Sequence, residues 1–194
     1  DNVNIEFLNK LITGANVDYE QLTSGNIYLP VHRTLYLNQL LENLEETAIG
    51  KNKEYLEVVD NLSNKNVHNF IELPDNLNTI LRYYQKVGYE WLKTLEHYKF
   101  GGILADDMGL GKTIQVLSVI MSYVNNVEKK EKKSSLVVSP SSLVLNWEGE
   151  ANRFTPNLKT IVIHGNSFER RRKIEKIDKY DLVITSYDLL KRNR

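Results

Sequence analysis

The sequence predicts an α/β fold in which helices cover both faces of a parallel sheet, preceded by a small, mainly helical or irregular region. From Leu81 onward, short runs of Val, Ile and Leu alternate with helical segments of about 10–15 residues, the order typical of βαβ units. The runs are continuously apolar, as expected for strands that are buried on both faces. Up to about Leu73 the sequence has no such order and is rich in asparagine. We therefore predict two domains, residues 1–75 and 76–194.

Apolar spacing in the first domain indicates short helices. Its expected elements, in chain order, are a helix ending at Gly14, an extended piece at Asn26–Val31, a helix over Leu37–Leu44, and a loop or irregular helix over Lys51–Asn69. Pro30 limits the extended piece, because proline cannot donate to a strand ladder. The run Pro74-Asp75-Asn76 marks the boundary to the second domain.

The second domain is expected to alternate strands with helices. The expected strands are Gly101–Ala105, Leu136–Ser139, Thr160–Ile163 and Asp181–Thr185. The expected helices are Arg82–Tyr98, Lys112–Val124, Ser142–Arg153, Phe168–Lys179 and a short one beginning near Tyr187. The charged run Glu128–Lys133 indicates a solvated loop.

Composition excludes several classes of protein. The 194 residues contain no cysteine, which excludes a disulfide framework, a cysteine zinc site and a thiol nucleophile. No apolar run reaches the roughly 18 residues that span a bilayer, and no basic-then-apolar leader opens the chain, so we expect no membrane partner and no secretion. The first residue is Asp1 rather than Met, so we expect a piece of a longer protein.

The balance of charges bears on nucleic acid as a partner. The formal net charge is zero, whereas a small dedicated nucleic-acid binder is usually strongly basic. Any contact with DNA must therefore be made by local loops and helix ends, or by parts of the protein outside this sequence.

The strongest motif is Asp106-Asp107-Met108-Gly109-Leu110-Gly111-Lys112-Thr113, which follows an expected strand and opens an expected helix. This is the context of a phosphate-binding loop. Gly109 and Gly111 allow backbone angles that direct several N–H groups into one concavity, and the following helix adds its positive end. Lys112 would reach the β- and γ-phosphates of ATP, and the Thr113 hydroxyl would ligate Mg²⁺.

One position departs from the strict pattern, which requires glycine five residues before Gly111 where this chain has Asp106. The departure excludes the commonest kinases and small GTPases and favours helicase-like loops. A chance Gly-x-Gly-Lys-Thr in an ordinary loop is the alternative, and the flanking strand and helix argue against it.

Four blocks of sequence carry a resemblance to a known family. Residues 101–113 resemble motif I of the Swi/Snf-type ATPases of helicase superfamily 2. In the family's order, residues 81–92 resemble its adenine-recognition segment, 139–147 its motif Ia and 180–187 its motif Ib. Ile27–Leu44 loosely resembles the end of the accessory region that precedes the motor in bacterial members. The resemblance implies that residues 76–194 are a RecA-like ATP-binding lobe, the first lobe of a DNA-translocating motor.

The resemblance also implies roles for individual residues. The nucleotide contacts would be Arg82, Gln85, Asp107, Met108, Gly109, Leu110, Gly111, Lys112 and Thr113, with Lys112 and Thr113 catalytic and Thr113 holding Mg²⁺ through ATP. The DNA contacts would be Ser141, Ser142, Thr185 and Ser186. The alternatives are that Arg82 is a surface cation, that the two serines at 141 and 142 are helix caps, and that Thr185 and Ser186 end a strand. Trp147 is expected to be a packing residue rather than a base-stacking one, and Arg170–Lys173 a solvated helix face rather than a DNA-binding patch.

One feature of such motors is not found in this sequence. The family carries an Asp-Glu pair on a later strand for Mg²⁺ and the attacking water, and this chain contains no Asp-Glu dipeptide. We therefore expect that a longer parent protein hydrolyses ATP in a DNA-dependent manner and that these 194 residues bind ATP with little or no turnover. The alternatives are another P-loop enzyme such as a small-molecule kinase, and a non-catalytic nucleotide-binding module. We expect a bacterial, cytoplasmic, nucleoid-associated location.

Overall fold

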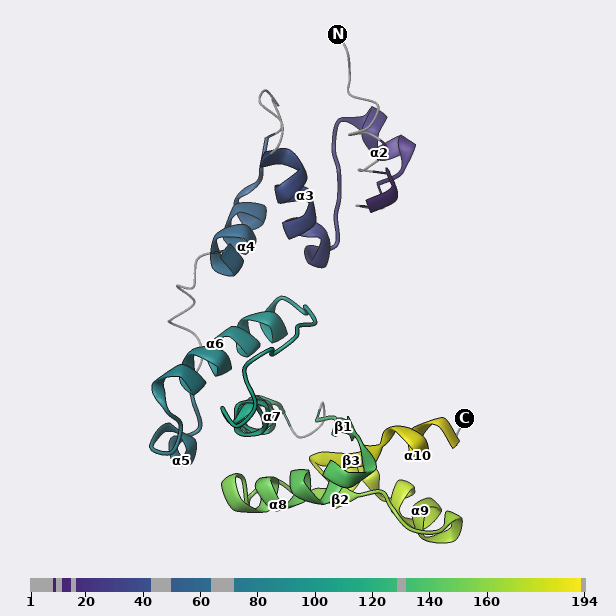
Figure 1. The fold of residues 1–194 in the computed structure, drawn as a ribbon. Coiled ribbons are helices and arrows are strands. Elements are labelled where there is room, and N and C mark those ends of the chain that lie inside the picture. The colour runs from purple at the N-terminus through teal and green to yellow at the C-terminus, as the bar shows by residue number, and fades with distance from the viewer. Residues whose placement is uncertain are drawn as a thin grey trace. The chain divides into compact units, whose positions relative to one another are not determined.

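The chain forms two compact units in the computed structural model, which describes residues 9, 12–14, 17–42, 50–63, 72–128 and 132–192 (Figure 1). One unit comprises residues 1–69 and 93–102, and the other comprises 70–92 and 103–194. The predicted domain boundary after residue 75 stays a prediction. Among the described residues, no helix is both long enough and apolar enough to cross a bilayer.

The second unit is built on a parallel sheet of three strands, β1 (Ser135–Ser139), β2 (Thr160–Val162) and β3 (Leu182–Ser186). The strand order is β1-β3-β2, so β3 is central, and Ile184 pairs with Val137 on one side and with Val162 on the other. Every residue of β3 is buried. This arrangement explains its continuous apolar sequence, because neither face of a central parallel strand meets water.

Both faces of the sheet are covered, as the sequence predicts. On one face, Leu182 and Ile184 join a core cluster with residues of α7 (Lys112–Asn126) and α8 (Val144–Phe154). On the other face, Val183 packs with Ile161 and Ile163 against the 3-10 turn η3 (Ile177–Lys179) and the residue that follows it. The predicted α/β fold is therefore confirmed.

The remaining helices of this part of the chain connect and flank the sheet. They are α5 (Asp75–Asn78), α6 (Tyr83–His97), the 3-10 turn η2 (Ser141–Leu143), α9 (Ser167–Ile174) and α10 (Tyr187–Arg192). The single helix predicted over Phe168–Lys179 is wrong: α9 ends at Ile174, and Lys176 leaves the helical region with φ −117° before η3 begins. The predicted helix start at Ser142 is a 3-10 turn, with α8 beginning at Val144.

The strand predicted at Gly101–Ala105 does not form. The segment has no regular structure, and Ile103 is 85% exposed. A strand needs a neighbouring strand whose backbone N–H and C=O groups form hydrogen bonds with its own. No strand of the described sheet pairs with this segment. Apolar character alone therefore led to the wrong prediction here.

The first unit is a small helical assembly. Its helices include α2 (Tyr19–Ser24), the 3-10 turn η1 (Val31–Arg33), α3 (Thr34–Glu42), α4 (Lys53–Ser63) and residues 93–97 of a helix that begins in the second unit, α6. The prediction of a loop or irregular helix over Lys51–Asn69 is corrected by α4, which is regular. Residues 64–69, Leu44 and most of the helix predicted before Gly14 lie outside the described residues.

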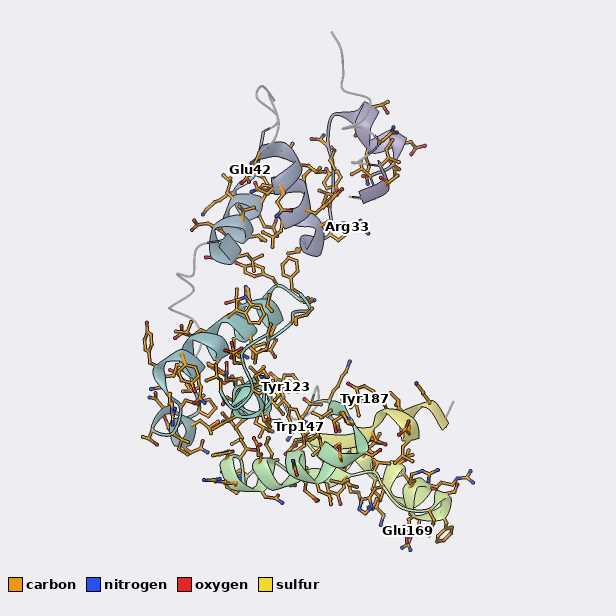
Figure 2. The ribbon with its side chains drawn as sticks, in the orientation of Figure 1. Arg33, Glu42, Tyr123, Trp147, Glu169 and Tyr187 are labelled. Atoms are coloured by element: carbon orange, nitrogen blue, oxygen red, sulfur yellow. The ribbon has the colours of Figure 1, made fainter. Side chains whose placement is uncertain are left out.

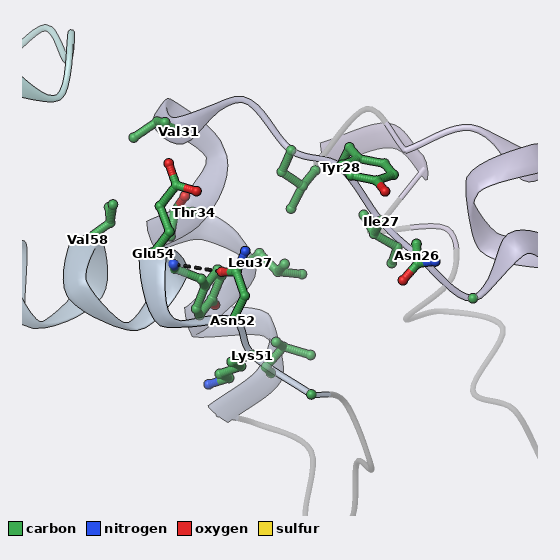
Figure 3. Close-up of a pocket in the computed structure, with 15 residues that line it drawn as sticks. Asn26, Ile27, Tyr28, Val31, Thr34, Leu37, Lys51, Asn52, Glu54 and Val58 are labelled. Carbon is green, nitrogen blue, oxygen red and sulfur yellow. Dashed lines mark hydrogen bonds between the residues drawn. The ribbon is translucent and has the colours of Figure 1, made fainter.

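A cavity of about 640 Å³ lies in this unit, between the segment 26–30, which links α2 to η1, and the helices α3 and α4 (Figure 3). Leu37 and Leu41 form its apolar floor and belong to the core cluster that includes Val17. Beside it, the Oδ1 of buried Asn38 accepts from Lys51 Nζ at 3.0 Å and from the Tyr55 hydroxyl at 3.3 Å. These hydrogen bonds join α3 to α4.

Candidate functional site

The loop from Asp106 to Gly111 leads directly into α7. Gly109 has φ +88° and Gly111 has φ +76°, angles that a residue with a side chain adopts only with strain. Gly111 is the N-cap of α7, and no side chain caps this helix start. The N–H groups of the first turn therefore face outward at the positive end of a 15-residue helix, which is the arrangement that attracts a phosphate.

Lys112 turns its amine back into this loop. Nζ donates to the carbonyl of Asp106 at 2.6 Å and to that of Asp107 at 2.8 Å. Both acceptors are neutral, whereas phosphate oxygens are charged and form stronger bonds with an ammonium group. Thr113 follows on α7 and is half-buried, while Asp107 and Met108 are exposed. The sequence-predicted phosphate contacts are thus brought together on one accessible loop, and a triphosphate with Mg²⁺ fits the chemistry of its donors.

Gln85 holds the far end of the same loop. It is third in α6, is 8% exposed, and its Oε1 accepts from the N–H of Arg82 at 3.0 Å, half of a capping box. Its Nε2 donates to the carbonyl of Leu110 at 3.1 Å. A Cβ built on Gly111 would lie 2.5 Å from that nitrogen. Nε2 has a second N–H to donate and Oε1 has a second lone pair to accept with, so the amide keeps the groups that a hydrogen bond to adenine needs. The Arg82 side chain is exposed.

The predicted DNA contacts lie at the carboxyl ends of the strands. Ser141 and Ser142 are exposed in η2, and Ser141 Oγ donates to Asp188 Oδ2 at 3.4 Å. Thr185 is 6% exposed and its hydroxyl donates to the carbonyl of Ile163 at 3.3 Å. Ser186 is also buried, and its Oγ accepts from the N–H of Leu189 in α10. The two serines of η2 are therefore open to solvent, whereas the side chains of Thr185 and Ser186 are buried.

A cavity of about 460 Å³ joins two of these positions. Its lining residues are Ser141, Val144, Leu145, Ile163, His164, Gly165, Ser186, Asp188 and Leu189. Sequence reasoning placed neither Asp188 nor the His164-Gly165 pair in a site. Gly165, at φ +101°, lies in the bend that follows β2. The signal that could have found these residues is their place just after parallel strands, because such ends meet at one edge of a sheet.

Two side-chain predictions concern packing. Trp147 is partly buried against the main core cluster, which confirms it as a packing residue (Figure 2). Arg171 and Arg172 are exposed, as expected for a solvated face. Arg170 and Lys173 differ, because each donates to a backbone carbonyl near the end of β2, Arg170 to Gly165 and Lys173 to Val162, both at 2.9 Å.

Sequence comparison assigns the second half of the chain to a known group. Residues 84–194 match the SNF2-related domain. A Mycoplasma pneumoniae protein named "Uncharacterized ATP-dependent helicase" is 36% identical over 178 residues, 90% of this chain and 17% of that protein. The "Helicase SWR1" of Kluyveromyces lactis is 43% identical over 123 residues, 62% of this chain and 8% of that protein. The chain thus spans less than a fifth of the length of these relatives.

A solved structure gives the same assignment. The Sulfolobus solfataricus SWI2/SNF2 ATPase core in complex with dsDNA matches with a TM-score of 0.50 at 38% identity, covering 57% of this chain and 22% of that one. The parallel sheet with helices on both faces therefore has the fold of such an ATPase core, as the sequence predicts.

Proposed function

Because this chain belongs to the SNF2-related domain family, we propose that it is the ATP-binding part of a DNA-dependent ATPase that translocates along double-stranded DNA. The observation that supports this most is the glycine loop at the start of α7, with the Lys112 amine held inside it by weak, replaceable acceptors. The ATPase core that resembles this fold is described as a complex with dsDNA, which supports duplex DNA as the partner.

The proposed nucleotide site uses the residues of this loop and of the start of α6. The N–H groups around Gly109, Gly111 and Lys112 would surround the phosphates, and the Lys112 amine would exchange its two carbonyl acceptors for phosphate oxygens. ATP would bring Mg²⁺, which supplies charge neutralisation at the phosphates, and the Thr113 hydroxyl would be its protein ligand. Gln85 would contact the adenine edge with its free amide positions, and Arg82, Asp107, Met108 and Leu110 would border the nucleotide.

The proposed DNA site lies at the carboxyl ends of the strands. Ser141 and Ser142, which are exposed, would contact a DNA phosphate through hydroxyl and backbone N–H groups. Thr185 and Ser186 are buried, so we assign their side chains to shaping the floor of this site, with contact left to the backbone at their end of β3. Such contacts fix position on the duplex and carry no sequence information.

We further propose that these 194 residues bind ATP without sustained turnover. They contain no Asp-Glu pair, and without such a pair neither Mg²⁺ nor the attacking water is oriented from the sheet. Hydrolysis would belong to a longer protein in which this chain is one part of the motor. We place that protein at the bacterial nucleoid in the cytoplasm, an inference from its proposed action on DNA.

The test is the ATPase rate of the full-length protein with and without duplex DNA, beside the rate of the 194-residue chain. We expect DNA to stimulate the full-length protein and the chain alone to show no sustained release of phosphate. A full-length protein that phosphorylates a small molecule and ignores DNA would support a P-loop kinase instead. Robust DNA-stimulated turnover by the chain alone would refute the assignment of turnover to the longer protein.

A further inference from the structure

A buried glutamine on α7, Gln115, contacts the loop and has no part in the site described so far. Its side chain is 0% exposed, and its Nε2 donates to Asp106 Oδ2 at 3.1 Å. Its Oε1 is buried and has no hydrogen-bond partner within the described part of the chain. An unpaired buried amide oxygen is costly, and a leucine of similar size would fill the space without that cost. Packing alone therefore does not explain a glutamine at this position.

Gly88 on α6 confines this side chain from the other direction. A Cβ added to Gly88 would overlap Gln115 Oε1. Gly88 lies inside α6, where glycine is a weaker helix former than alanine. Glycine at this point leaves the space that the amide of Gln115 occupies, so the position of that amide is set jointly by α6 and by Asp106.

Asp106 links Gln115 to the lysine. Its carboxylate accepts from Gln115, and its backbone carbonyl accepts from Lys112 Nζ at 2.6 Å. At the other end of the loop, Gln85 holds the Leu110 carbonyl. Gln85 therefore ties the end of the loop to the start of α6, whereas Gln115, which lies beside Gly88, ties its beginning to α7.

We propose that Gln115 is a positioning residue for the phosphate-binding loop. By holding the Asp106 carboxylate to α7, it sets where the loop begins and hence where the carbonyls that hold the Lys112 amine lie. It acts through Asp106 and touches no ligand itself. The proposal rests on the proposed function only in naming ATP as the ligand, because the position of the loop can be measured without nucleotide.

The test exchanges the donor and the acceptor of this hydrogen bond. Gln115→Leu removes the donor, and Gln115→Glu sets two carboxylates against each other. The double variant Q115E/D106N restores a hydrogen bond in the reverse sense. Ser118→Ala is the matched control, because Ser118 is equally buried on α7 and its hydroxyl donates to the carbonyl of Ile114 on the same helix at 2.7 Å. Each variant of the chain is measured by amide hydrogen exchange across residues 103–112 without nucleotide, and by calorimetric titration with Mg-ATP.

We expect Q115L to speed exchange in the loop and to weaken ATP binding by roughly tenfold, since the half-buried Asp106 carboxylate loses its donor. Q115E should exchange faster in the loop and bind ATP more weakly than Q115L. Q115E/D106N should restore most of the protection and most of the affinity, a recovery that a purely space-filling role would not produce. Gly88→Ala should also speed exchange in the loop, because its added methyl group would displace the amide of Gln115. This variant serves as the test if a Gln115 variant does not fold.

Two results would overturn the inference. The first is that the loop amides of Q115L and of Gly88→Ala exchange no faster than those of the Ser118→Ala control. The second is that Q115E/D106N has the same fast exchange and weak ATP binding as Q115E. If the unaltered chain binds no ATP while Q115L still loosens the loop, the positioning role stands and the proposed function fails.

Discussion

The two compact units of the chain differ in how their interiors are built. In the second unit one continuous core joins α7, α8 and the sheet, and Leu117 and Ile184 within it are 0% exposed. In the first unit a small cluster around Leu37 and Leu41 lies beside a cavity of about 640 Å³ and the hydrogen-bonded Asn38. The candidate site is attached to the larger core, so its geometry should survive changes that loosen the first unit.

The largest expected effect comes from emptying the larger core. Leu117→Ala should lower the free energy of unfolding by about 2–5 kcal/mol, because it leaves a cavity in a fully packed interior. Leu41→Ala is the matched change in the first unit and should cost toward the lower end of that range, since its surroundings already contain open space. Chemical denaturation followed by ATP titration checks both. Loss of ATP binding in Leu41→Ala under folding conditions would contradict the independence of the site.

The next effect concerns the loop itself. Gly111→Ala should suffer backbone strain of about 1–3 kcal/mol and also overlap Gln85, so ATP binding should fall by more than the strain alone predicts. Gly109→Ala is the control, because it has a similar φ but open space around the added carbon. Calorimetric titration of both variants isolates the contact with Gln85. Equal losses in the two would show that this contact does not matter.

A smaller effect is expected where the strands begin. Asp181 is 4% exposed, its Oδ2 accepts from the Lys159 N–H at 2.9 Å, and its Oδ1 forms an ion pair with Lys132. Asp181→Ala should cost about 1–3 kcal/mol in stability, because the Lys159 N–H loses its acceptor and Lys132 loses its ion-pair partner. Asp188→Ala, at an exposed carboxylate of the same unit, should cost much less in the same denaturation experiment. Similar costs would mean that Asp181 does not join β2 to β3.

The smallest effect is a pH dependence confined to the first unit. Burial, and secondarily the Glu42 carboxylate, raise the pKa of Tyr55 above its ordinary value of 10.0. Its contribution to stability is therefore complete below pH 10 and is lost as the pH rises through the higher folded-state pKa, because the unfolded chain loses the proton first. Tyr55→Phe should flatten this alkaline loss. An identical alkaline profile in the two proteins would exclude a contribution from Tyr55.

Features set by local sequence could be predicted, whereas features set by contacts between distant residues could not. Three strands and the helix after the glycine loop follow from continuous apolar runs and from the loop motif, since both are local signals. The Gly101–Ala105 strand was predicted wrongly because pairing is not local, and the α9–η3 break because a single residue, Lys176, leaves the helical region. α4 was missed as a regular helix because polar residues on either side of it obscured its apolar face of Tyr55, Val58 and Leu62.

The candidate site likewise has residues that local sequence predicts and residues that only the folded chain brings together. The loop residues could be named from their spacing, whereas Gln115 could not, because its role depends on Gly88 and Asp106, which approach it only in the folded chain. The cavity that joins Ser141 to Asp188 was likewise invisible, since it is made by strand ends far apart in sequence. The roles proposed for Gln85, Ser141, Ser142 and the loop in binding ATP and DNA stay predictions.

The most direct measurement is equilibrium binding of Mg-ATP to this chain and to its Lys112→Ala variant, with Lys179→Ala, at an exposed lysine of η3 outside both proposed sites, as the control. If the loop at the start of α7 binds a triphosphate, the unaltered chain and Lys179→Ala should bind alike, and Lys112→Ala should bind on the order of a hundredfold more weakly. Equal affinity in all three proteins would contradict the account, because the phosphates would then lie somewhere other than the glycine loop.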